Sequence, residues 1–355
     1  MPTLRDPVLD TLFLPLLGGT LAWPSDGVLF LRARDGAPLH ARDWPGLVCE
    51  QSFKPEADAL AHAGFATETA GERTYALVLV LPPRQRDEAR ALFAHAFARL
   101  APGGTVIAAM ANDAGAKSGE ADVAKLAGTP ASRSKHKCRV FWAQGDALDR
   151  ELAAQWAALD APRRVVDGRY VSRPGVFAWD RVDAASALLA EHLPRDLRGQ
   201  AADLGAGYGY LSVELLQRCP GIEALDLYEA ERRALDLARE NLAPFAQRAR
   251  LGFHWHDVVD GLPQRYDTIV TNPPFHAPHG VERPDLGRAF IATAAAALQP
   301  DGRLWLVANR HLPYETELGA HFGQVRTVAQ RGGFKVVEAV KAGAHAARAA
   351  GRRPR

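Results

Sequence analysis

The two halves of this 355-residue sequence share an internal repeat. Residues 75–83 align without gaps with residues 266–274, and both segments run from a tyrosine through an apolar stretch to a Pro-Pro pair. Residues 100–112 and 298–309 also correspond, because each combines Leu, Pro and Gly with an apolar run that ends in Ala-Asn. Such a repeat indicates that one structural unit has been duplicated. The order of strand, loop, Ala-rich helix, turn and strand predicts the same α/β unit in each half.

The length of the chain supports two domains, because a typical domain has roughly 150 residues. We place the boundary within residues 159–169, where Pro162 and Gly168 flank a basic pair. Residues 1–160 are therefore assigned to a first domain and residues 170–341 to a second. Residues 342–355 are assigned to a basic tail.

The second half alternates short apolar runs with helical patterns. Expected strands at residues 201–204, 224–228, 268–271 and 304–307 alternate with expected helices at residues 210–218, 230–242 and 286–298. Strands separated by helices form a parallel sheet with right-handed crossovers. Two further runs flank Arg331-Gly332-Gly333, which predicts an antiparallel hairpin. A parallel sheet that ends in such a hairpin is the Rossmann-like architecture expected of class I methyltransferases.

Composition predicts a soluble, cytoplasmic protein. Apolar residues make up 47% of the sequence, and no stretch approaches the roughly 18 uninterrupted apolar residues of a membrane span. Residues 1–14 lack the basic region and apolar core of an export signal. Cys49, Cys138 and Cys219 lack the paired short spacing of zinc ligands, so we expect buried free thiols and no metal.

A glycine-rich segment lies where the first strand of the second half gives way to its helix. It covers residues 203–210, Asp-Leu-Gly-Ala-Gly-Tyr-Gly-Tyr. Gly205 and Gly207 let the backbone turn tightly and let a ligand approach closely. Glu229 ends the next expected strand, where an acid can accept hydrogen bonds from both hydroxyls of a ribose. This pattern predicts a cofactor that contains a nucleoside, either NAD or S-adenosylmethionine.

Two residues of this segment favour S-adenosylmethionine. Tyr210 stands where the NAD motif Gly-x-Gly-x-x-Gly has its last glycine. The acidic Asp203 precedes the first glycine, close to where a pyrophosphate would lie, and a sulfonium with an amino-acid tail tolerates that charge better. Asp203 and Tyr208 are therefore assigned to the cofactor loop with the glycines.

The most specific motif is Asn272-Pro273-Pro274-Phe275, at the end of the expected strand at residues 268–271. Ligands of open α/β sheets bind at the carboxyl ends of the strands, so the motif faces the same crevice as the glycine loop. An exocyclic amine of a nucleobase is a poor nucleophile, because its lone pair is delocalised, and it needs two acceptors that hold its hydrogens. The Asn272 amide oxygen and the Pro273 carbonyl can supply them, and consecutive prolines make them rigid. Phe275 offers a face on which a planar base can stack.

Five motifs within residues 171–341 carry a resemblance to a known family: Pro174-Gly-Val-Phe177, Asp180-Arg-Val-Asp183, Asp203-Leu-Gly-Ala-Gly207, Asn272-Pro-Pro-Phe-His276 and Val307-Ala-Asn-Arg-His-Leu-Pro-Tyr314. They resemble the bacterial ribosomal RNA guanine-N2 methyltransferases of the small- and large-subunit types. The resemblance implies two tandem Rossmann-like class I methyltransferase domains, of which the first is degenerate. It also implies methyl transfer from S-adenosylmethionine to the N2 amine of a guanine in ribosomal RNA, with the 16S type favoured.

The resemblance also implies roles for single residues. The cofactor would be held by Gly205, Gly207, Glu229 and Asp257. Asp257 falls where the family places a side chain on the adenine amine, and the cap of a helix or turn is the alternative for this aspartate. Asp183 would begin the helix that closes the pocket, although Ala185 replaces a glycine that the family often has. Residues 272–275 would hold the target base. Asn272 is also assigned to the cofactor-binding residues.

The first half resembles, more loosely, the degenerate methyltransferase-like domain that such enzymes carry in front. Leu81 occupies the position of Asn272, and no convincing glycine loop with a following acid is present. We therefore expect an inactive first domain that supports the second and binds RNA. The net charge of +2 is too small for a general nucleic-acid surface. The candidate RNA contact is a local basic cluster of Arg133, Lys135, Lys137 and Arg139.

Other functions fit parts of the sequence. The Asn-Pro-Pro-Phe tetrapeptide also suits glutamine N5 methylation of a release factor and adenine N6 methylation of nucleic acid. A catalytically silent RNA-binding factor for ribosome assembly is the alternative outside the enzymes, and the intact Asn272, Gly205 and Glu229 argue against it. The expected partner is ribosomal RNA or a ribosomal subunit, bound by a monomer.

Overall fold

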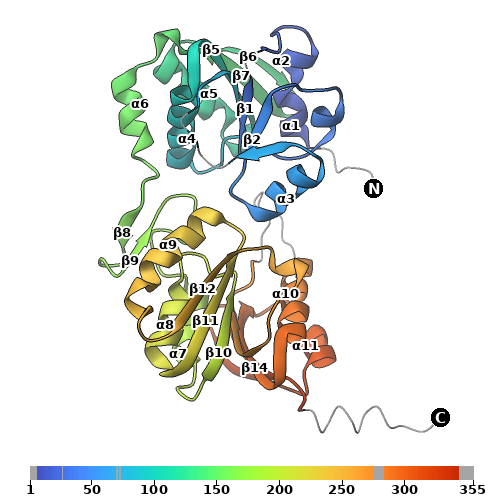
Figure 1. The fold of residues 1–355 in the computed structure, drawn as a ribbon, viewed down its shortest axis with the longest axis vertical. Coiled ribbons are helices and arrows are strands. Elements are labelled where there is room, and N and C mark those ends of the chain that lie inside the picture. The colour runs from blue at the N-terminus through green and yellow to red at the C-terminus, as the bar shows by residue number, and fades with distance from the viewer. Residues whose placement is uncertain (1–5, 26, 69–70, 72, 275–283, 344–355) are drawn as a thin grey trace, which may run out of the picture. The chain divides into compact units, whose positions relative to one another are not determined.

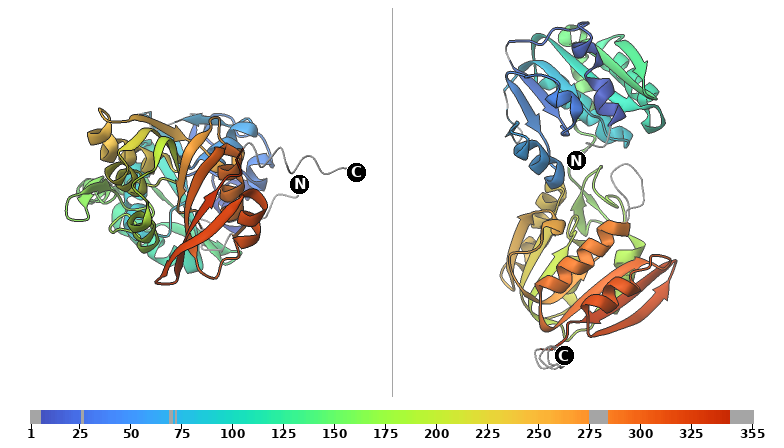
Figure 2. Two further views of the ribbon diagram at one scale, coloured as in Figure 1. Left: turned by 90° about the horizontal axis from the view of Figure 1, so that it is seen from below. Right: turned by 90° about the vertical axis from the view of Figure 1, so that its right-hand side faces the viewer.

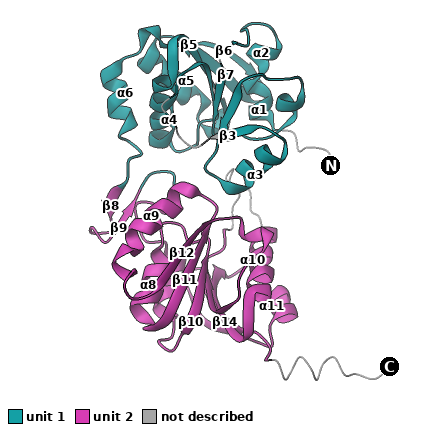
Figure 3. Cartoon of the chain, viewed as in Figure 1, with its two compact units in different colours: residues 1–162, 173–175 teal, residues 163–172, 176–355 magenta. Residues whose placement is uncertain are grey.

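The computed structural model describes residues 6–25, 27–68, 71, 73–274 and 284–343. The chain forms two compact units, one of residues 1–162 and 173–175 and the other of residues 163–172 and 176–355 (Figure 3). The division after Pro162 falls inside residues 159–169, the segment in which the sequence places a boundary.

The first unit is an α/β structure. Its strands are β1 (Val28–Leu31), β2 (Leu47–Glu50), β3 (Ala66–Glu68), β4 (Tyr75–Val80), β5 (Leu100–Ala111), β6 (Ala131–Lys135) and β7 (Cys138–Gln144). Its helices are α1 (Pro7–Leu12), α2 (Leu14–Leu17), α3 (Lys54–His62), α4 (Arg86–Ala98), α5 (Ala116–Ala127) and α6 (Arg150–Ala157).

The second unit begins with a small antiparallel ribbon of β8 (Arg163–Val165) and β9 (Tyr170–Ser172). Its further strands are β10 (Arg198–Leu204), β11 (Gly221–Glu229), β12 (Arg250–Trp255), β13 (Tyr266–Thr271), β14 (Leu298–Asn309), β15 (Gln324–Arg331) and β16 (Phe334–Val340). Its helices are α7 (Ala184–His192), α8 (Tyr210–Arg218), α9 (Arg232–Leu242), α10 (Pro284–Ala297) and α11 (Glu315–His321) (Figure 1).

Each unit contains a seven-stranded sheet, and the two sheets have the same strand order. The first sheet runs β3-β2-β1-β4-β5-β7-β6 and the second runs β12-β11-β10-β13-β14-β16-β15. In the second sheet the five strands β10 to β14 pair in parallel. The strand β16 pairs antiparallel with both β14 and β15. This is the parallel sheet with a terminal hairpin that the sequence predicts. Its presence in both units confirms the internal repeat and the tandem Rossmann-like fold class.

The correspondence between the units extends to the pairing register. In the first sheet Tyr75 pairs with Leu100 before a register shift, and in the second sheet Tyr266 pairs with Leu298 before the same kind of shift. These are the residues at which the sequence alignment of the two halves begins. The repeat is therefore a repeat of backbone structure and not only of composition.

Helices cover both faces of the second sheet. One core packs α7, α8 and α9 against one face, and another packs α10 and α11 against the opposite face (Figures 1 and 2). Along β14, Trp305 and Val307 belong to the first core, and Leu304 and Leu306 belong to the second. Successive side chains of a strand point to opposite faces, so a strand buried on both faces appears in the sequence as a continuous apolar run.

The hairpin at the end of the second sheet has a two-residue turn. Gly332 and Gly333 connect β15 to β16 with φ angles of 60° and 86°, which is the backbone that tight hairpins favour and that glycine adopts without strain. The three cysteines are free and buried, as the sequence predicts. Within the described ranges, no helix combines the length and the apolar character needed to cross a membrane.

Candidate cofactor and target site

The glycine loop connects β10 to α8 at the carboxyl end of the central strand. Gly205, Gly207 and Gly209 have φ angles of 73°, 57° and 90°, a region that L side chains rarely adopt. A Cβ atom on Gly207 would meet no atom within 4 Å. The loop therefore leaves open space beside its backbone at the start of α8.

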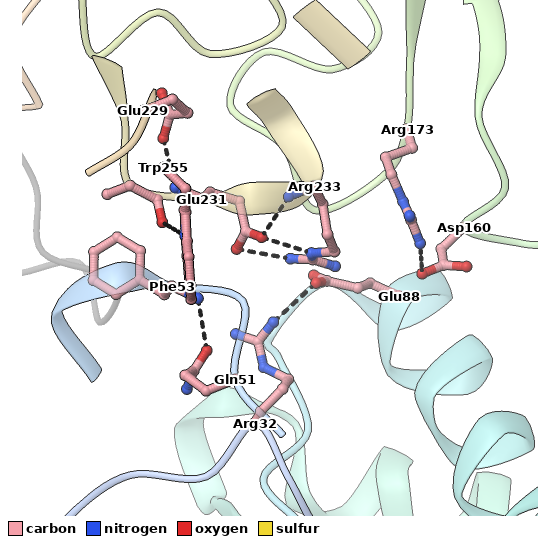
Figure 4. Close-up of polar contacts among 11 residues, drawn as sticks. Arg32, Gln51, Phe53, Glu88, Asp160, Arg173, Glu229, Glu231, Arg233 and Trp255 are labelled. Atoms are coloured by element: carbon pink, nitrogen blue, oxygen red, sulfur yellow. Dashed lines mark hydrogen bonds and ion pairs between the residues drawn. The ribbon is translucent and has the colours of Figure 1, made fainter. Parts of the chain in front are cut away.

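Glu229 ties this loop to the next strand. The Gly207 N–H donates to one carboxylate oxygen of Glu229 (2.7 Å). The Glu231 N–H donates to the other oxygen (2.7 Å; Figure 4). Burial raises the pKa of the Glu229 carboxyl, and these backbone donors oppose the rise. Because a carboxylate offers about four acceptor positions, Glu229 keeps capacity for the hydroxyls of a ribose.

Asp203 lies beneath the loop rather than in the pocket. Its side chain is fully buried, and one oxygen accepts a hydrogen bond from the Ser212 hydroxyl (2.7 Å). Burial raises the pKa of Asp203 to about 7, while the Ser212 bond lowers it and Glu229 raises it further. The second oxygen has no partner among the described residues. Asp203 is therefore a buried, weakly acidic group close to the glycine loop.

Asp257 and Tyr208 each have a partner within the second unit. Asp257 caps a short 3-10 helix (Val258–Asp260) by accepting a hydrogen bond from the Val259 N–H (3.0 Å), which is the alternative role weighed for it from the sequence. Its contact with an adenine stays a prediction. Tyr208 is buried and donates from its hydroxyl to the Arg181 carbonyl (3.2 Å).

Asn272 follows β13 directly and is held by two side chains from α7 and its cap. Its amide nitrogen donates to the Asp183 carboxylate (3.0 Å) and to the Ser186 hydroxyl (2.9 Å). Asp183 also caps α7 by accepting from the Ser186 N–H (2.9 Å). Turning the amide over would place its oxygen against the carboxylate, so the network determines the orientation.

This orientation leaves the Asn272 amide oxygen as an acceptor that lacks a donor in the described part of the chain. The Asn272 amide oxygen is buried and has no hydrogen-bond partner among the described residues. A buried polar atom of this kind costs free energy unless a ligand satisfies it. The neighbouring Pro273 is buried and Pro274 is exposed. Phe275, to which the sequence assigns base stacking, lies outside the described residues.

One pocket brings several of the predicted residues together. Gly205, Gly207, Tyr208, Asp183 and Asn272 all line it. Asp203, Glu229 and Asp257 do not line it. The enclosed part of the site therefore lies between the glycine loop, the start of α7 and the end of β13.

Ser186 and Phe177 are among the pocket-lining residues that the sequence analysis did not assign to the site. Ser186 stands three residues after the helix cap Asp183, in the first turn of α7. That spacing was a usable signal, because a side chain at this position of a helix lies next to the cap residue. Phe177 belongs to a motif that carries the family resemblance, but no role was assigned to it.

The basic cluster lies on one hairpin of the first unit. Arg133 and Lys135 are on the edge strand β6, Lys137 is in the turn, and residues 131–137 are all exposed. Arg139 is on β7 and forms an ion pair with Glu120. The hairpin therefore presents three exposed cations, while the charge of the fourth is compensated. In the described part of the chain, no three His, Cys, Asp or Glu side chains are grouped to hold a metal ion.

Comparisons with known proteins agree with this geometry. The family model of the methyltransferase small domain matches residues 167–338. A ribosomal RNA small subunit methyltransferase C from Stutzerimonas stutzeri is 36% identical over 197 residues, which are 55% of this chain and 56% of that relative. The protein of the same name from Shewanella halifaxensis is 30% identical over 299 residues, which are 81% of this chain and 84% of that relative.

One solved structure is similar over nearly the whole chain. It is the T. thermophilus 16S rRNA N2 G1207 methyltransferase (RsmC) in complex with AdoMet and guanosine. The TM-score is 0.78 at 27% sequence identity, and the match covers 96% of this chain and 93% of the other.

Fold and site define the class of this protein, which is a Rossmann-like methyltransferase with S-adenosylmethionine as its cofactor. When bound, this cofactor supplies an electrophilic methyl group. Because the similarity to the Shewanella halifaxensis protein extends over most of both chains, the chain belongs to the ribosomal RNA small subunit methyltransferase C family.

Proposed function

We propose that this chain transfers the methyl group of S-adenosylmethionine to the exocyclic N2 amine of a guanine in 16S ribosomal RNA. The observation that carries the amine chemistry is the buried, unpartnered amide oxygen of Asn272. The names of the similar proteins support the choice of guanine and of 16S RNA. Glutamine N5 and adenine N6 methylation need the same acceptor, so they become outcomes of the test.

In this proposal the residues of the site divide the work. The Asn272 oxygen accepts one hydrogen of the amine, and the Pro273 carbonyl accepts the other. Asp183 and Ser186 hold the Asn272 amide so that its oxygen does not need to reorient when the substrate arrives. Such preorganised electrostatic contacts act without reorganisation cost at the moment of reaction. Gly205, Gly207 and Glu229 hold the cofactor, with Asp257 at its adenine.

The proposal is tested with purified protein and isotopically labelled S-adenosylmethionine. The substrates are 30S subunits and naked 16S RNA from a strain that lacks this enzyme, and the RNA is digested to nucleosides after the reaction. We expect the label in N2-methylguanosine. Label in N6-methyladenosine, or only in protein, would contradict the guanine assignment. Cofactor binding without any transfer to RNA or protein would favour a silent assembly factor.

We also propose that the β6–β7 hairpin of the first unit contacts the RNA backbone. Its three exposed cations, Arg133, Lys135 and Lys137, provide local positive charge on a chain with a net charge of only +2. Contacts of this kind give affinity that falls as salt rises. Reversing two charges, as in Lys135→Glu with Lys137→Glu, should raise the KM for RNA several-fold at low salt and leave kcat unchanged.

The control for the hairpin variant is Lys125→Glu, because Lys125 is exposed on α5 outside the hairpin. Lys125→Glu makes the same change of charge as each hairpin substitution, at one position instead of two. The hairpin proposal fails if Lys125→Glu raises the KM as much as the hairpin variant does, or if the hairpin variant shows the salt dependence of the wild type.

A further inference from the structure

Phe177 is the most exposed large apolar side chain in the described part of the chain. It is 68% exposed, whereas Leu17, Val259 and Val325 are between 40% and 47% exposed. Leaving an aromatic ring in water forgoes the free energy of its burial. An exposed aromatic residue at the edge of a pocket is therefore a candidate for ligand binding.

The Phe177 side chain lines the pocket that also contains Asn272 and Asp183. Glu229 and Asp257, which the proposed function places at the ribose and the adenine, do not line it. Phe177 therefore shares a pocket with the nucleophile-positioning amide, whereas the residues proposed for the nucleoside part of the cofactor do not line that pocket.

The backbone around Phe177 is anchored. The preceding Val176 is buried in the core, and the following Ala178 has a φ angle of 48°, which a residue with a side chain rarely adopts. The Arg181 N–H closes this turn by donating to the Ala178 carbonyl (3.2 Å). The Tyr208 hydroxyl holds the turn from the glycine loop through Arg181. An anchored, strained turn that keeps an apolar ring in solvent indicates a functional constraint.

The pocket already has aromatic walls that a buried cofactor can use. Tyr208 is 4% exposed and Tyr210 is partly buried, and both line the pocket. A ring that stays two-thirds exposed is better suited to a ligand that arrives from solvent. A nucleobase that is displayed from RNA presents a flat face that stacks on such a ring.

We propose that Phe177 stacks on the target nucleobase and so directs its amine toward the Asn272 oxygen. The inference rests on the proposed function for the identity of that base. The stacking itself requires only that the methyl acceptor is a base.

The test compares Phe177→Ala, Phe177→Leu and Phe177→Trp. For Phe177→Ala we expect kcat/KM for 30S subunits to fall about ten- to hundredfold, the range that stacking on one base supplies. The Kd for S-adenosylmethionine, measured by calorimetry, should change less than threefold, which also shows that the variant is folded. Phe177→Trp should stay within a few-fold of the wild type. Phe177→Leu should behave like the alanine variant, because it is apolar but has no flat face.

A second measurement isolates the base from the rest of the RNA. Guanosine binding is measured by calorimetry in the presence of S-adenosylhomocysteine, so that no turnover occurs, and Phe177→Ala should weaken it about tenfold or more. The matched control is Val325→Ala, which removes an exposed apolar side chain from β15 of the same unit. It should change neither quantity.

The inference is overturned if Phe177→Ala weakens cofactor binding tenfold while guanosine binding is unchanged, because the ring would then belong to the cofactor wall. It is also overturned if Phe177→Leu retains full activity. Failure of the proposed function is seen separately, in the wild type. There, label in a nucleoside other than N2-methylguanosine contradicts the guanine assignment, and the variants still report whether Phe177 acts on that base.

Discussion

The loops after the central strands of the two sheets occupy equivalent positions and differ in what they can bind. The pairing registers align Leu31 at the end of β1 with Leu204 at the end of β10. The next residue is left-handed in both units, with φ angles of 53° at Arg32 and 73° at Gly205. One residue later, the N–H donates to the neighbouring strand in both units, from Ala33 (3.1 Å) and Ala206 (3.2 Å). The backbone conformation is shared, and the side chains are not.

The residue after the second strand shows the same relation. Glu229 accepts from the Gly207 N–H of its loop and from the N–H two residues on. Gln51 stands at the equivalent position and accepts from the Phe53 N–H (2.9 Å; Figure 4). It also donates to the Ala33 carbonyl (2.7 Å). An amide thus replaces the carboxylate. Both side chains bond their loops, but the amide offers a single acceptor oxygen, whereas the carboxylate offers two and keeps capacity for a ribose.

The other equivalent positions of the first unit also carry different side chains. Arg32 stands in place of Gly205 and pairs with Glu88 on α4 (3.0 Å) (Figure 4). Leu81 is buried in place of Asn272, and Phe30 is buried in place of Asp203. The comparison teaches that the backbone of a cofactor loop persists when packing alone requires it, because the sheet still needs a connection at that point. Function, in contrast, depends on a few side chains.

The largest expected effect is at Asn272, whose equivalent in the first unit is Leu81. Asn272→Ala should lower kcat by at least about a hundredfold, the size of effect typical for loss of one preorganised contact at a reacting group. The Kd for S-adenosylmethionine should stay within a few-fold. Ser186→Ala removes one of the two groups that accept hydrogen bonds from the Asn272 amide nitrogen, and it should lower kcat by less. Turnover is measured with 30S subunits, and near-normal turnover of Asn272→Ala would contradict the proposed positioning of the amine.

The next prediction compares the contributions of Glu229 and of its first-unit equivalent Gln51 to cofactor affinity. Glu229→Ala should weaken cofactor binding about tenfold to a hundredfold, because hydrogen bonds to charged groups contribute roughly 1.5–3 kcal/mol each. Gln51→Ala should leave cofactor affinity unchanged. Calorimetry with the wild type should give one cofactor per chain. A stoichiometry of two, or a loss of affinity in Gln51→Ala, would mean that the first unit still binds the cofactor.

A third effect, on stability rather than on activity, concerns the buried carboxyl of Asp203, where the first unit has Phe30. Its pKa is raised from 3.8 to about 7, so the folded protein binds this proton more tightly than the unfolded chain. Stability should therefore fall as the pH rises from about 4 to 7, by up to about 1.4 kcal/mol per pH unit, and the loss should be complete above 7. Asp203→Asn removes this contribution.

Thermal unfolding between pH 5 and pH 8 measures the effect. The melting temperature of Asp203→Asn relative to the wild type should rise by several degrees across that range. A constant difference would show that Asp203 does not titrate there in the folded protein.

The sequence by itself determined the repeat, the order of strands and helices, the glycine loop and the Asn-Pro-Pro-Phe motif. These features depend on neighbouring residues, because apolar periodicity, glycine conformations and proline restraints act over a few positions along the chain. The turn at Gly332 and Gly333 is an example, since its two residues are sufficient to predict the hairpin. The equivalence of Leu81 and Asn272 also follows from a gapless alignment of the two halves.

Only the tertiary structure decided which atoms of these motifs are free to act. The Asn272 amide is oriented by Asp183 and Ser186, which lie 89 and 86 residues away in the chain. Three other features likewise depend on elements that meet only when the sheet forms. They are the burial of Asp203, the equivalence of Gln51 to Glu229 and the exposure of Phe177. Hydrogen-bond capacity and burial are set by contacts between distant segments, whereas a local motif records only which atoms are present.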